Sequence, residues 1–258
     1  MQNRPHSSVP YFILLAVTTG LFWTQPVLGA GWETVVKEGG VVVEKKEVEG
    51  RELPVFRGKV VIRGSIYETL TVLDDSSART KWVHRCSESR VVKTITDFKR
   101  YIYNRTDAPW PVNDRDVVVL TNISVDVVKK HVRIAFSSKS GILPEVDGVV
   151  RIPRLEGMYF LEAKGQDHTR VTYEIDTDPG GWLPRWLVKR TTRDIPLKTL
   201  LNLQKQVDGV RNKSNGDELK SYWHERLEKE TGQKVDVSSK PESAPSPDQK
   251  ASASEPKQ

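Results

Sequence analysis

Apolar and polar residues alternate along much of the chain, a pattern typical of strands that bury one face of a sheet. The clearest case is 171–176, where Val171, Tyr173 and Ile175 alternate with polar residues. Similar runs predict strands at 41–48, 55–62, 91–96, 101–104, 117–120, 132–136, 149–152 and 158–163. Short strands joined by brief loops favour an antiparallel meander.

Helical spacing marks the elements between these strands. Apolar residues at helical spacing between Ile66 and Leu73 follow Ser65, which can cap a helix by accepting a backbone N–H bond. A short helix is predicted around Trp82, and a segment from Trp32 is predicted to be helical as well.

A long helix follows the last strand, from about residue 182 to 210. Gly180 and Gly181 break the strand, because glycine adopts turn dihedrals that other residues avoid. Large apolar side chains then recur about one helical turn apart, beginning with Trp182. Strands, two early helices and one final helix predict an α+β domain. The final helix could close a cavity in the sheet, or it could simply pack on a core.

The first thirty residues have the composition of an export signal. Arg4 supplies a positive charge, an apolar run spans 11–23, and small residues follow around Ala30. The apolar run is shorter than the roughly 20 residues that a membrane span needs. We therefore expect cleavage near Ala30 and a periplasmic or secreted protein, with an uncleaved membrane anchor as the alternative.

The mature chain divides by composition into a domain and two C-terminal segments. Residues 31–210 carry the strand and helix pattern, and 211–231 predict a short amphipathic helix. Residues 232–258 consist mainly of Ser, Pro, Ala, Lys and Glu. A segment of that kind buries too little apolar surface to offset its ordering entropy, so we expect it to be disordered.

Composition places the chain among globular proteins, with 37% hydrophobic and 29% charged residues. The net charge of +6 is only mildly positive and the basic residues are scattered, so nucleic-acid binding is not expected. The single cysteine, Cys86, excludes an intramolecular disulfide and is predicted to be a core thiol.

Motifs for catalysis, metal ligation or cofactor binding are absent from the sequence. It has no Gly-rich phosphate loop, no HExxH and no Gly-x-Ser-x-Gly, and its five histidines are not at ligand spacing. Asp114, Arg115 and Asp116 form a compact charged group, which we interpret as a local ion pair at a strand start rather than a catalytic group. The absence of motifs favours a binding protein over an enzyme.

Three ordered stretches resemble the START family, the lipid-transfer domains related to steroidogenic acute regulatory protein. They are Pro-Trp-Pro-Val-Asn-Asp-Arg-Asp-Val-Val at 109–118, the Gly-Ile-Leu-Pro-Glu loop at 141–145 with Gly-Val-Val-Arg at 148–151, and Gly-Trp-Leu-Pro at 181–184 with its helix. The resemblance extends from about residue 41 to 210.

The resemblance implies a helix-grip fold, in which a curved antiparallel sheet wraps around the long C-terminal helix and encloses a hydrophobic tunnel. The tunnel of the family holds one lipid or sterol-like molecule, and its gate is the helix with the loop that corresponds to residues 137–148. Some family members have a buried arginine where this chain has Thr121. An ion-paired anchor at that position is therefore not expected.

The residues predicted to line the tunnel and the gate are large and apolar or aromatic. They are Tyr101, Tyr103, Trp110, Leu120, Ile134, Phe136, Leu143, Phe160, Tyr173, Trp182, Trp186, Leu200 and Leu201. The resemblance implies a monomeric lipid-binding protein that touches membranes transiently and carries its ligand between them, without a cofactor. Two alternatives stay open: an enzyme such as a cyclase or hydrolase, for which Tyr101, Tyr103 or Tyr173 is the first candidate, and a ligand-free interaction module.

The leader pattern predicts the mature N-terminus. Sequencing of the protein isolated from the cell envelope should begin near Ala30 or Gly31. An intact Met1 on a membrane-embedded form would contradict cleavage and support the uncleaved anchor.

Overall fold

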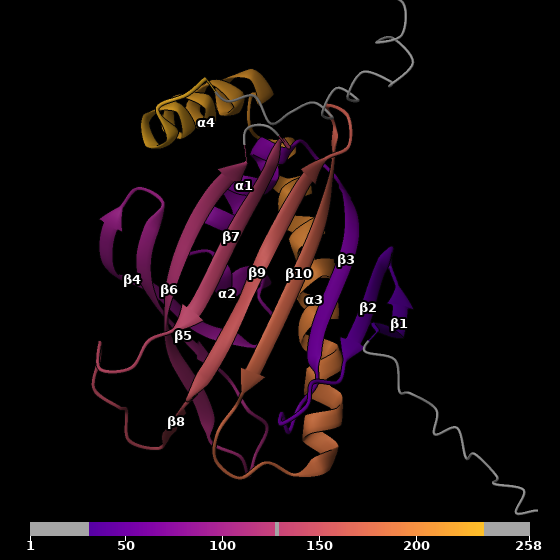
Figure 1. The fold of residues 1–258 in the computed structure, drawn as a ribbon, viewed down its shortest axis with the longest axis vertical. Coiled ribbons are helices and arrows are strands. Elements are labelled where there is room, and N and C mark those ends of the chain that lie inside the picture. Colours follow the sequence, from indigo (N-terminus) through magenta and orange to yellow (C-terminus); the bar gives the residue numbers. More distant parts are fainter. Residues whose placement is uncertain (1–30, 127–128, 235–258) are drawn as a thin grey trace, which may run out of the picture.

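The computed structural model describes residues 31–126 and 129–234 (Figure 1). The predicted leader and nearly all of the predicted disordered tail lie outside the described residues. None of the described helices is long and apolar enough to span a membrane.

A ten-stranded sheet forms the frame of the domain, in the order β1-β2-β3-β10-β9-β7-β6-β5-β4 with β8 beside β6. Its strands are β1 (Glu33–Glu38), β2 (Val41–Lys46), β3 (Val55–Arg63), β4 (Cys86–Thr96), β5 (Lys99–Thr106), β6 (Asp114–Asp126), β7 (His131–Ser138), β8 (Val149–Arg151), β9 (Arg154–Ala163) and β10 (His168–Asp178). Neighbouring strands are antiparallel except for β8, which runs parallel to β6 with Arg115 opposite Val150. The antiparallel prediction is therefore confirmed apart from this one short strand.

The segment after Trp32 is a strand and not the predicted helix. It forms β1, which pairs with β2 and places Val36 opposite Val43. Thr34, Val35 and Val36 are β-branched, and such residues lose side-chain freedom in a helix but fit the pleat of a sheet. Spacing alone does not separate the two structures in so short a segment.

The two early helices form where the sequence predicts them, as α1 (Ile66–Asp74) and α2 (Arg79–Trp82). Ser65 caps α1 by accepting a hydrogen bond from the backbone N–H of Glu68, and the Glu68 carboxylate accepts one from the backbone N–H of Ser65. This reciprocal capping box satisfies two backbone donors that would otherwise lack partners.

The long helix α3 (Arg185–Arg211) lies along the sheet, beside β3 and β10 in Figure 1. Leu200, Leu203 and Val207 on α3 are completely buried in the main core. Gly58 on β3 makes this approach possible, because a Cβ at that position would collide with the Leu200 side chain. Each such leucine stabilises the domain by roughly 1.5–3 kcal/mol through burial. The helix-grip fold is thus confirmed, with a sheet whose edge strands β1 and β4 do not pair in the described chain.

A further helix, α4 (Gly216–Thr231), covers α1 at the end of the sheet opposite β8 (Figure 1). Trp223 and Leu227 of α4 are buried in the main core, and the Trp223 ring stacks on Phe98 with centroids 6.3 Å apart. The Trp223 indole N–H donates to Thr71 Oγ1 at 2.9 Å. This helix is therefore packed into the core through one face.

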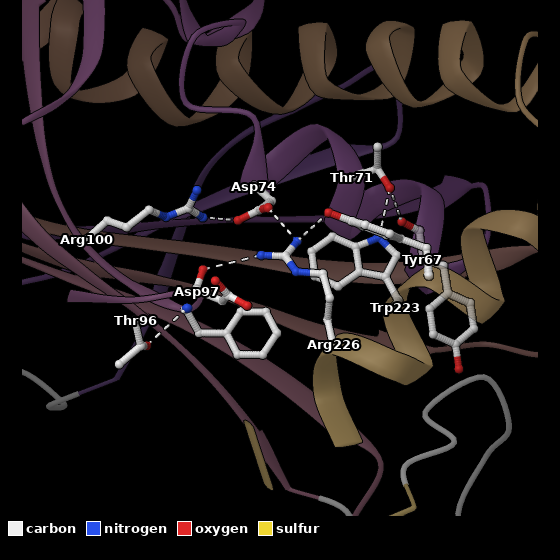
Figure 2. A network of polar contacts seen from close by, with 10 residues as sticks. Tyr67, Thr71, Asp74, Thr96, Asp97, Arg100, Trp223 and Arg226 are labelled. Atoms are coloured by element: carbon white, nitrogen blue, oxygen red, sulfur yellow. Dashed lines mark hydrogen bonds and ion pairs between the residues drawn. The ribbon is translucent and has the colours of Figure 1, made fainter. Parts of the chain in front are cut away.

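A single carboxylate joins α4 to α1 and to the β4–β5 hairpin (Figure 2). Asp74, the last residue of α1, accepts hydrogen bonds from Arg100 of β5 and, at 2.9 Å, from Arg226 of α4. The Arg226 guanidinium also lies 4.7–5.0 Å from the ring centroids of Trp223 and Phe98. Cations are attracted to aromatic faces at such distances, so charge and packing act together here.

We expect Asp74→Asn to destabilise the protein, because two partly buried arginines would lose their counter-charge. The free energy of unfolding, measured with urea, should fall by about 2 kcal/mol. Asp97→Asn is the matched control, since the Asp97 carboxylate pairs with Lys229 at the surface, at 3.8 Å, while Arg226 contacts the Asp97 backbone oxygen, which the substitution keeps. That control should change the free energy of unfolding by no more than about 0.5 kcal/mol. Equal losses in the two variants would contradict the proposed role of Asp74.

Candidate functional site

A cavity of about 200 Å³ lies between the sheet and the first half of α3. Its apolar wall consists of residues from β6, β9, β10 and α3, among them Val117, Val119, Leu155, Ile175, Leu187 and Ile195. Pockets that hold drug-sized ligands typically have volumes of about 300–1,000 Å³. The cavity is thus smaller than a typical pocket for a drug-sized ligand.

Three aromatic rings form one side of the cavity. Tyr159 and Tyr173 stack face to face, with ring centroids 4.5 Å apart and planes 7° from parallel. Phe136 lies 6.1 Å from the first ring and 6.4 Å from the second. The stack fixes both phenol groups at the cavity surface.

Arg79 of α2 brings a positive charge to this aromatic side. It borders the cavity close to Tyr159, Tyr173 and Cys86. Its Nε is buried without a hydrogen-bond partner in the described chain, and the Asp75 carboxylate acts on its charge only from beyond ion-pair distance. Burial lowers the pKa of the Arg79 guanidinium, but arginine remains protonated in proteins. The cavity is therefore bordered by a cation whose Nε donor is not used by the described residues.

Arg115 of β6 also borders the cavity, where the chain passes from β10 to α3. Only 6% of its surface is exposed. Its guanidinium donates to the backbone oxygens of Asn113 at 2.5 Å, Gly180 at 3.4 Å and Trp182 at 3.3 Å. Its Nε, like that of Arg79, is buried without a hydrogen-bond partner in the described chain.

The neighbours of Arg115 do not pair with it, so the predicted local ion pair is wrong. Asp114 accepts two hydrogen bonds from Arg105, at 2.7 and 3.0 Å. Asp116 accepts two from Arg151, at 2.6 and 3.1 Å. Because side chains alternate along a strand, adjacent residues face opposite sides of the sheet and cannot pair easily.

Two arginines fasten the loop 137–148, which the resemblance identifies as part of the gate, and the segment 180–184, from which the long helix begins. Arg151 donates to the backbone oxygens of Leu143 at 3.2 Å and Pro144 at 2.9 Å, within the loop 137–148. Arg115 holds the segment 180–184 by donating hydrogen bonds to the backbone carbonyls of Gly180 and Trp182. Gly180 and Gly181 there have φ angles of 64° and 62°, a region that favours glycine.

Of the residues predicted for the tunnel and gate, Phe136 and Tyr173 border the cavity. Ile134 and Leu200 are in the main core, and Leu201 packs against it. Leu143 and Phe160 are half-buried away from the cavity, and the Phe160 ring contacts His131. Trp110, Trp182 and Trp186 have 90%, 71% and 54% of their surfaces exposed.

Tyr101, Tyr103 and Leu120 face the other side of the sheet. On β5 the cavity is bordered by Asn104, and on β6 by Val117 and Val119. Successive side chains point to opposite faces of a strand, so residues one or three positions away point elsewhere. The sequence identifies these strands correctly but does not show which face meets the cavity.

The polar residues of the cavity belong to no motif that would mark them in the sequence. Arg79, His84 and Asn104 had no pattern that marked them, and Arg115 was interpreted as part of a local ion pair. Cys86 is buried, as predicted, but it also borders the cavity, and burial raises the pKa of its thiol. The only available signal was a basic residue three positions before Trp82 on a short predicted helix.

The chemistry of these groups suits hydrogen-bond donation. Burial raises the pKa of Tyr173 to about 12, and the pKa of Tyr159 also lies well above its ordinary value because of burial. Both phenols are therefore protonated at neutral pH, when Arg79 carries its charge. Within 31–126 and 129–234, the residues form no cluster of three or more His, Cys, Asp or Glu side chains that would hold a metal ion.

Comparison with known proteins agrees with the fold. The sequence model of the START domain matches residues 22–206. An uncharacterized protein of Pseudomonas aeruginosa is 34% identical over 180 residues, which cover 69% of this chain and 87% of that protein. The phosphatidylcholine transfer protein of Mus musculus is 26% identical over 164 residues, covering 62% of this chain and 76% of the relative.

Solved structures give the same result. A StAR-related lipid transfer protein fragment from Xanthomonas axonopodis superposes with a TM-score of 0.64 at 31% identity, covering 69% of this chain and 99% of the fragment. Human StAR-related lipid transfer protein 5 has a TM-score of 0.64 at 21% identity, covering 70% of this chain and 88% of its own. The second likeness is one of fold alone.

The raised pKa of Tyr173 predicts how stability depends on pH. The unfolded chain releases this phenolic proton near pH 10 and the folded chain near pH 12, so the folded state binds more protons between these values. The stabilisation is complete below pH 10 and is lost as the pH rises to 12, by up to about 3 kcal/mol. Urea unfolding across this range should show a smaller decline for Tyr173→Phe than for the wild type. Parallel declines would contradict the assignment.

Proposed function

This chain belongs to the START family, and on that premise we propose that it binds a lipid with an anionic polar group inside the cavity. The alkyl part would contact the apolar wall, and the polar group would meet Arg79. The observation that carries the proposal is the half-buried Arg79 guanidinium, whose Nε is buried without a hydrogen-bond partner and which forms no ion pair in the described chain, beside an apolar cavity. A bound carboxylate or phosphate would supply that counter-ion.

Apolar burial would provide most of the affinity. Each methylene removed from water contributes about 0.8 kcal/mol, so an alkyl chain of ten carbons could supply about 8 kcal/mol. The cost of association reduces this sum. The polar group would then fix the orientation of the lipid more than its affinity, as in other largely apolar sites.

Charge favours an anionic lipid over a cationic or neutral one. Arg79, Arg85 and Arg115 border the cavity, against the single carboxylate of Asp107 among the described lining residues. Hydrogen bonds between guanidinium and anionic oxygens are about twice as strong as those between neutral groups. The phenols of Tyr159 and Tyr173 would add two neutral donors near Arg79. The name of the mouse relative supports a phospholipid-like ligand, without specifying the headgroup here.

Exposed tryptophans support transient contact with a membrane. Trp110, Trp182 and Trp186 flank residues of the cavity wall, namely Pro109, Leu183 and Leu187. Tryptophan prefers the interface between water and lipid. We infer that this end of the molecule touches the bilayer when lipid enters or leaves, and that a monomer carries the lipid between membranes. The leader pattern supports a periplasmic or secreted location.

An enzyme on the same scaffold has weaker support. Tyr173 and Tyr159 retain their protons at neutral pH, so neither is suited to act as a general base. A cyclase or hydrolase would also need a group that activates a nucleophile, and His84 is the one imidazole among the described lining residues. Lipid binding without chemistry accounts for the same residues more simply.

The proposal is tested with dodecyl phosphate and dodecanol, which share one alkyl chain and differ in charge. Native mass spectrometry should show wild-type protein binding one dodecyl phosphate more tightly than dodecanol. Arg79→Met should weaken dodecyl phosphate at least about tenfold and leave dodecanol within twofold, because only the phosphate needs the cation. Arg133→Met, which removes an exposed arginine from β7, is the control and should match the wild type.

Arg79→Lys distinguishes loss of charge from loss of packing, and it should recover part of the phosphate affinity. Two results would overturn the proposal. One is wild-type protein that binds neither probe and yields no lipid on extraction. The other is Arg79→Met protein with undiminished preference for dodecyl phosphate.

A further inference from the structure

We propose that Arg115 is a second anion-binding residue, at the entrance of the cavity, and that an arriving anionic lipid draws it away from the carbonyls of Gly180 and Trp182. The segment 180–184 would then be free to move and admit the alkyl chain. The inference rests on the proposed function, because it assigns a route to the same anionic ligand.

Arg115 forms no ion pair in the described chain, although an aspartate stands on each side of it. Asp114 is held by Arg105, and the pKa of Asp114 is lowered by the backbone N–H of Ala108 and by that guanidinium. Asp116 is held by Arg151, whose own pKa the hydrogen bond raises. The hydrogen bonds that the Arg115 guanidinium makes to the described residues therefore go to backbone carbonyls, while Asp114 acts on its charge only from beyond ion-pair distance.

Two of the carbonyl bonds that Arg115 makes are long. Bonds between a guanidinium and an anionic oxygen have typical lengths of about 2.7–2.9 Å. The bonds from Arg115 to Gly180 and Trp182 measure 3.4 and 3.3 Å, and Nε makes no bond at all in the described chain. A phosphate or carboxylate could bind two of these donors at once, which neutral carbonyls on separate residues cannot match.

The segment 180–184 makes few other hydrogen bonds with the described residues. In the described part of the chain, Arg115 makes the hydrogen bonds that join this segment to the sheet. The remaining bonds are local: the Gly180 N–H donates to Asp178, and Pro184 accepts from the first turn of α3. Pro184 caps that helix without a side-chain hydrogen bond. Segments with few fixed contacts are the easiest to open.

The loop 137–148 is held differently from the segment 180–184. Arg151 is bound by both oxygens of Asp116 while it donates to Leu143 and Pro144, so its charge is already satisfied. An incoming anion would gain little from Arg151 and more from Arg115. The structure therefore assigns the first movement to the segment 180–184 and not to the loop 137–148.

Arg115 and Arg79 border one continuous cavity, with the apolar wall between them. An anionic group that binds Arg115 first can pass to Arg79, whose Nε is also without a partner in the described chain. Arg115 would then return to the carbonyls and close the segment over the alkyl chain. Arg115 governs entry in this scheme, whereas Arg79 governs the final affinity.

The experiment compares wild type, Arg115→Gln and the control Arg133→Met. Arg133 is an exposed arginine of β7 that does not line the cavity. Hydrogen exchange of the peptide 179–187 is measured without ligand, and uptake of dodecyl phosphate and dodecanol is followed by stopped-flow tryptophan fluorescence. Circular dichroism melting verifies that each variant is folded.

In Arg115→Gln, we expect peptide 179–187 to exchange at least fivefold faster than in the wild type. Wild-type protein should take up dodecyl phosphate faster than dodecanol, and this advantage should vanish in Arg115→Gln while the final occupancy stays within twofold. Arg133→Met should match the wild type in both measurements. If Arg115→Gln does not fold, Arg115→Lys is used instead. It should increase the exchange rate of peptide 179–187 but keep part of the faster uptake of dodecyl phosphate, because lysine retains the positive charge and lacks the several donors of the planar guanidinium.

If peptide 179–187 of Arg115→Gln exchanges its amide hydrogens at the wild-type rate, the proposal that Arg115 fastens the segment is overturned. An undiminished rate advantage for dodecyl phosphate would overturn its role in binding the anion. If wild-type protein takes up neither probe, the proposed function fails and the anion-binding role of Arg115 fails with it. The exchange measurement still judges the fastening role in that case, since it needs no ligand.

Discussion

The structure depends on the close packing of α3 against the sheet. Leu200, Leu203 and Val207 fill the space between them, and Gly58 lets the helix approach β3 without a collision. Contact is tight along this second half of α3, whereas the first half stands over the cavity. Strong burial at one end of the helix therefore permits an opening at the other without loss of the fold. At the end remote from the opening, α4 closes the core with Trp223.

Charge is distributed unevenly over this frame. Asp74 satisfies Arg100 and Arg226 far from the cavity, and Asp116 satisfies Arg151 beside the loop 137–148. Arg79 and Arg115, the arginines with buried and unpartnered Nε groups in the described chain, both border the cavity. Buried charges are costly unless they are paired. The free-energy cost of burying the unpaired donors of Arg79 and Arg115 beside one apolar cavity is explained if a bound ligand offsets that cost.

The fold was largely predictable from the sequence, because period-2 alternation and helical spacing record which residues are buried. Alternation at 171–176 identified β10, and Ser65 identified the start of α1. The segment after Trp32 was mistaken because a short apolar run fits a helix and a strand equally well. The cavity was less predictable, since it depends on which face of each strand turns inward. Arg79 and Arg115 stand out because their Nε atoms lack hydrogen-bond partners in the described chain. Such a lack of contacts cannot be read from the sequence.

The most direct test is a crystal structure of the protein with dodecyl phosphate bound. The account predicts the phosphate within hydrogen-bond distance of the Arg79 guanidinium, near the Tyr159 and Tyr173 hydroxyls, with the alkyl chain against Val117, Leu155 and Ile175. A phosphate that stays in solvent outside the segment 180–184, with Arg79 still unpaired beside the alkyl chain, would contradict it.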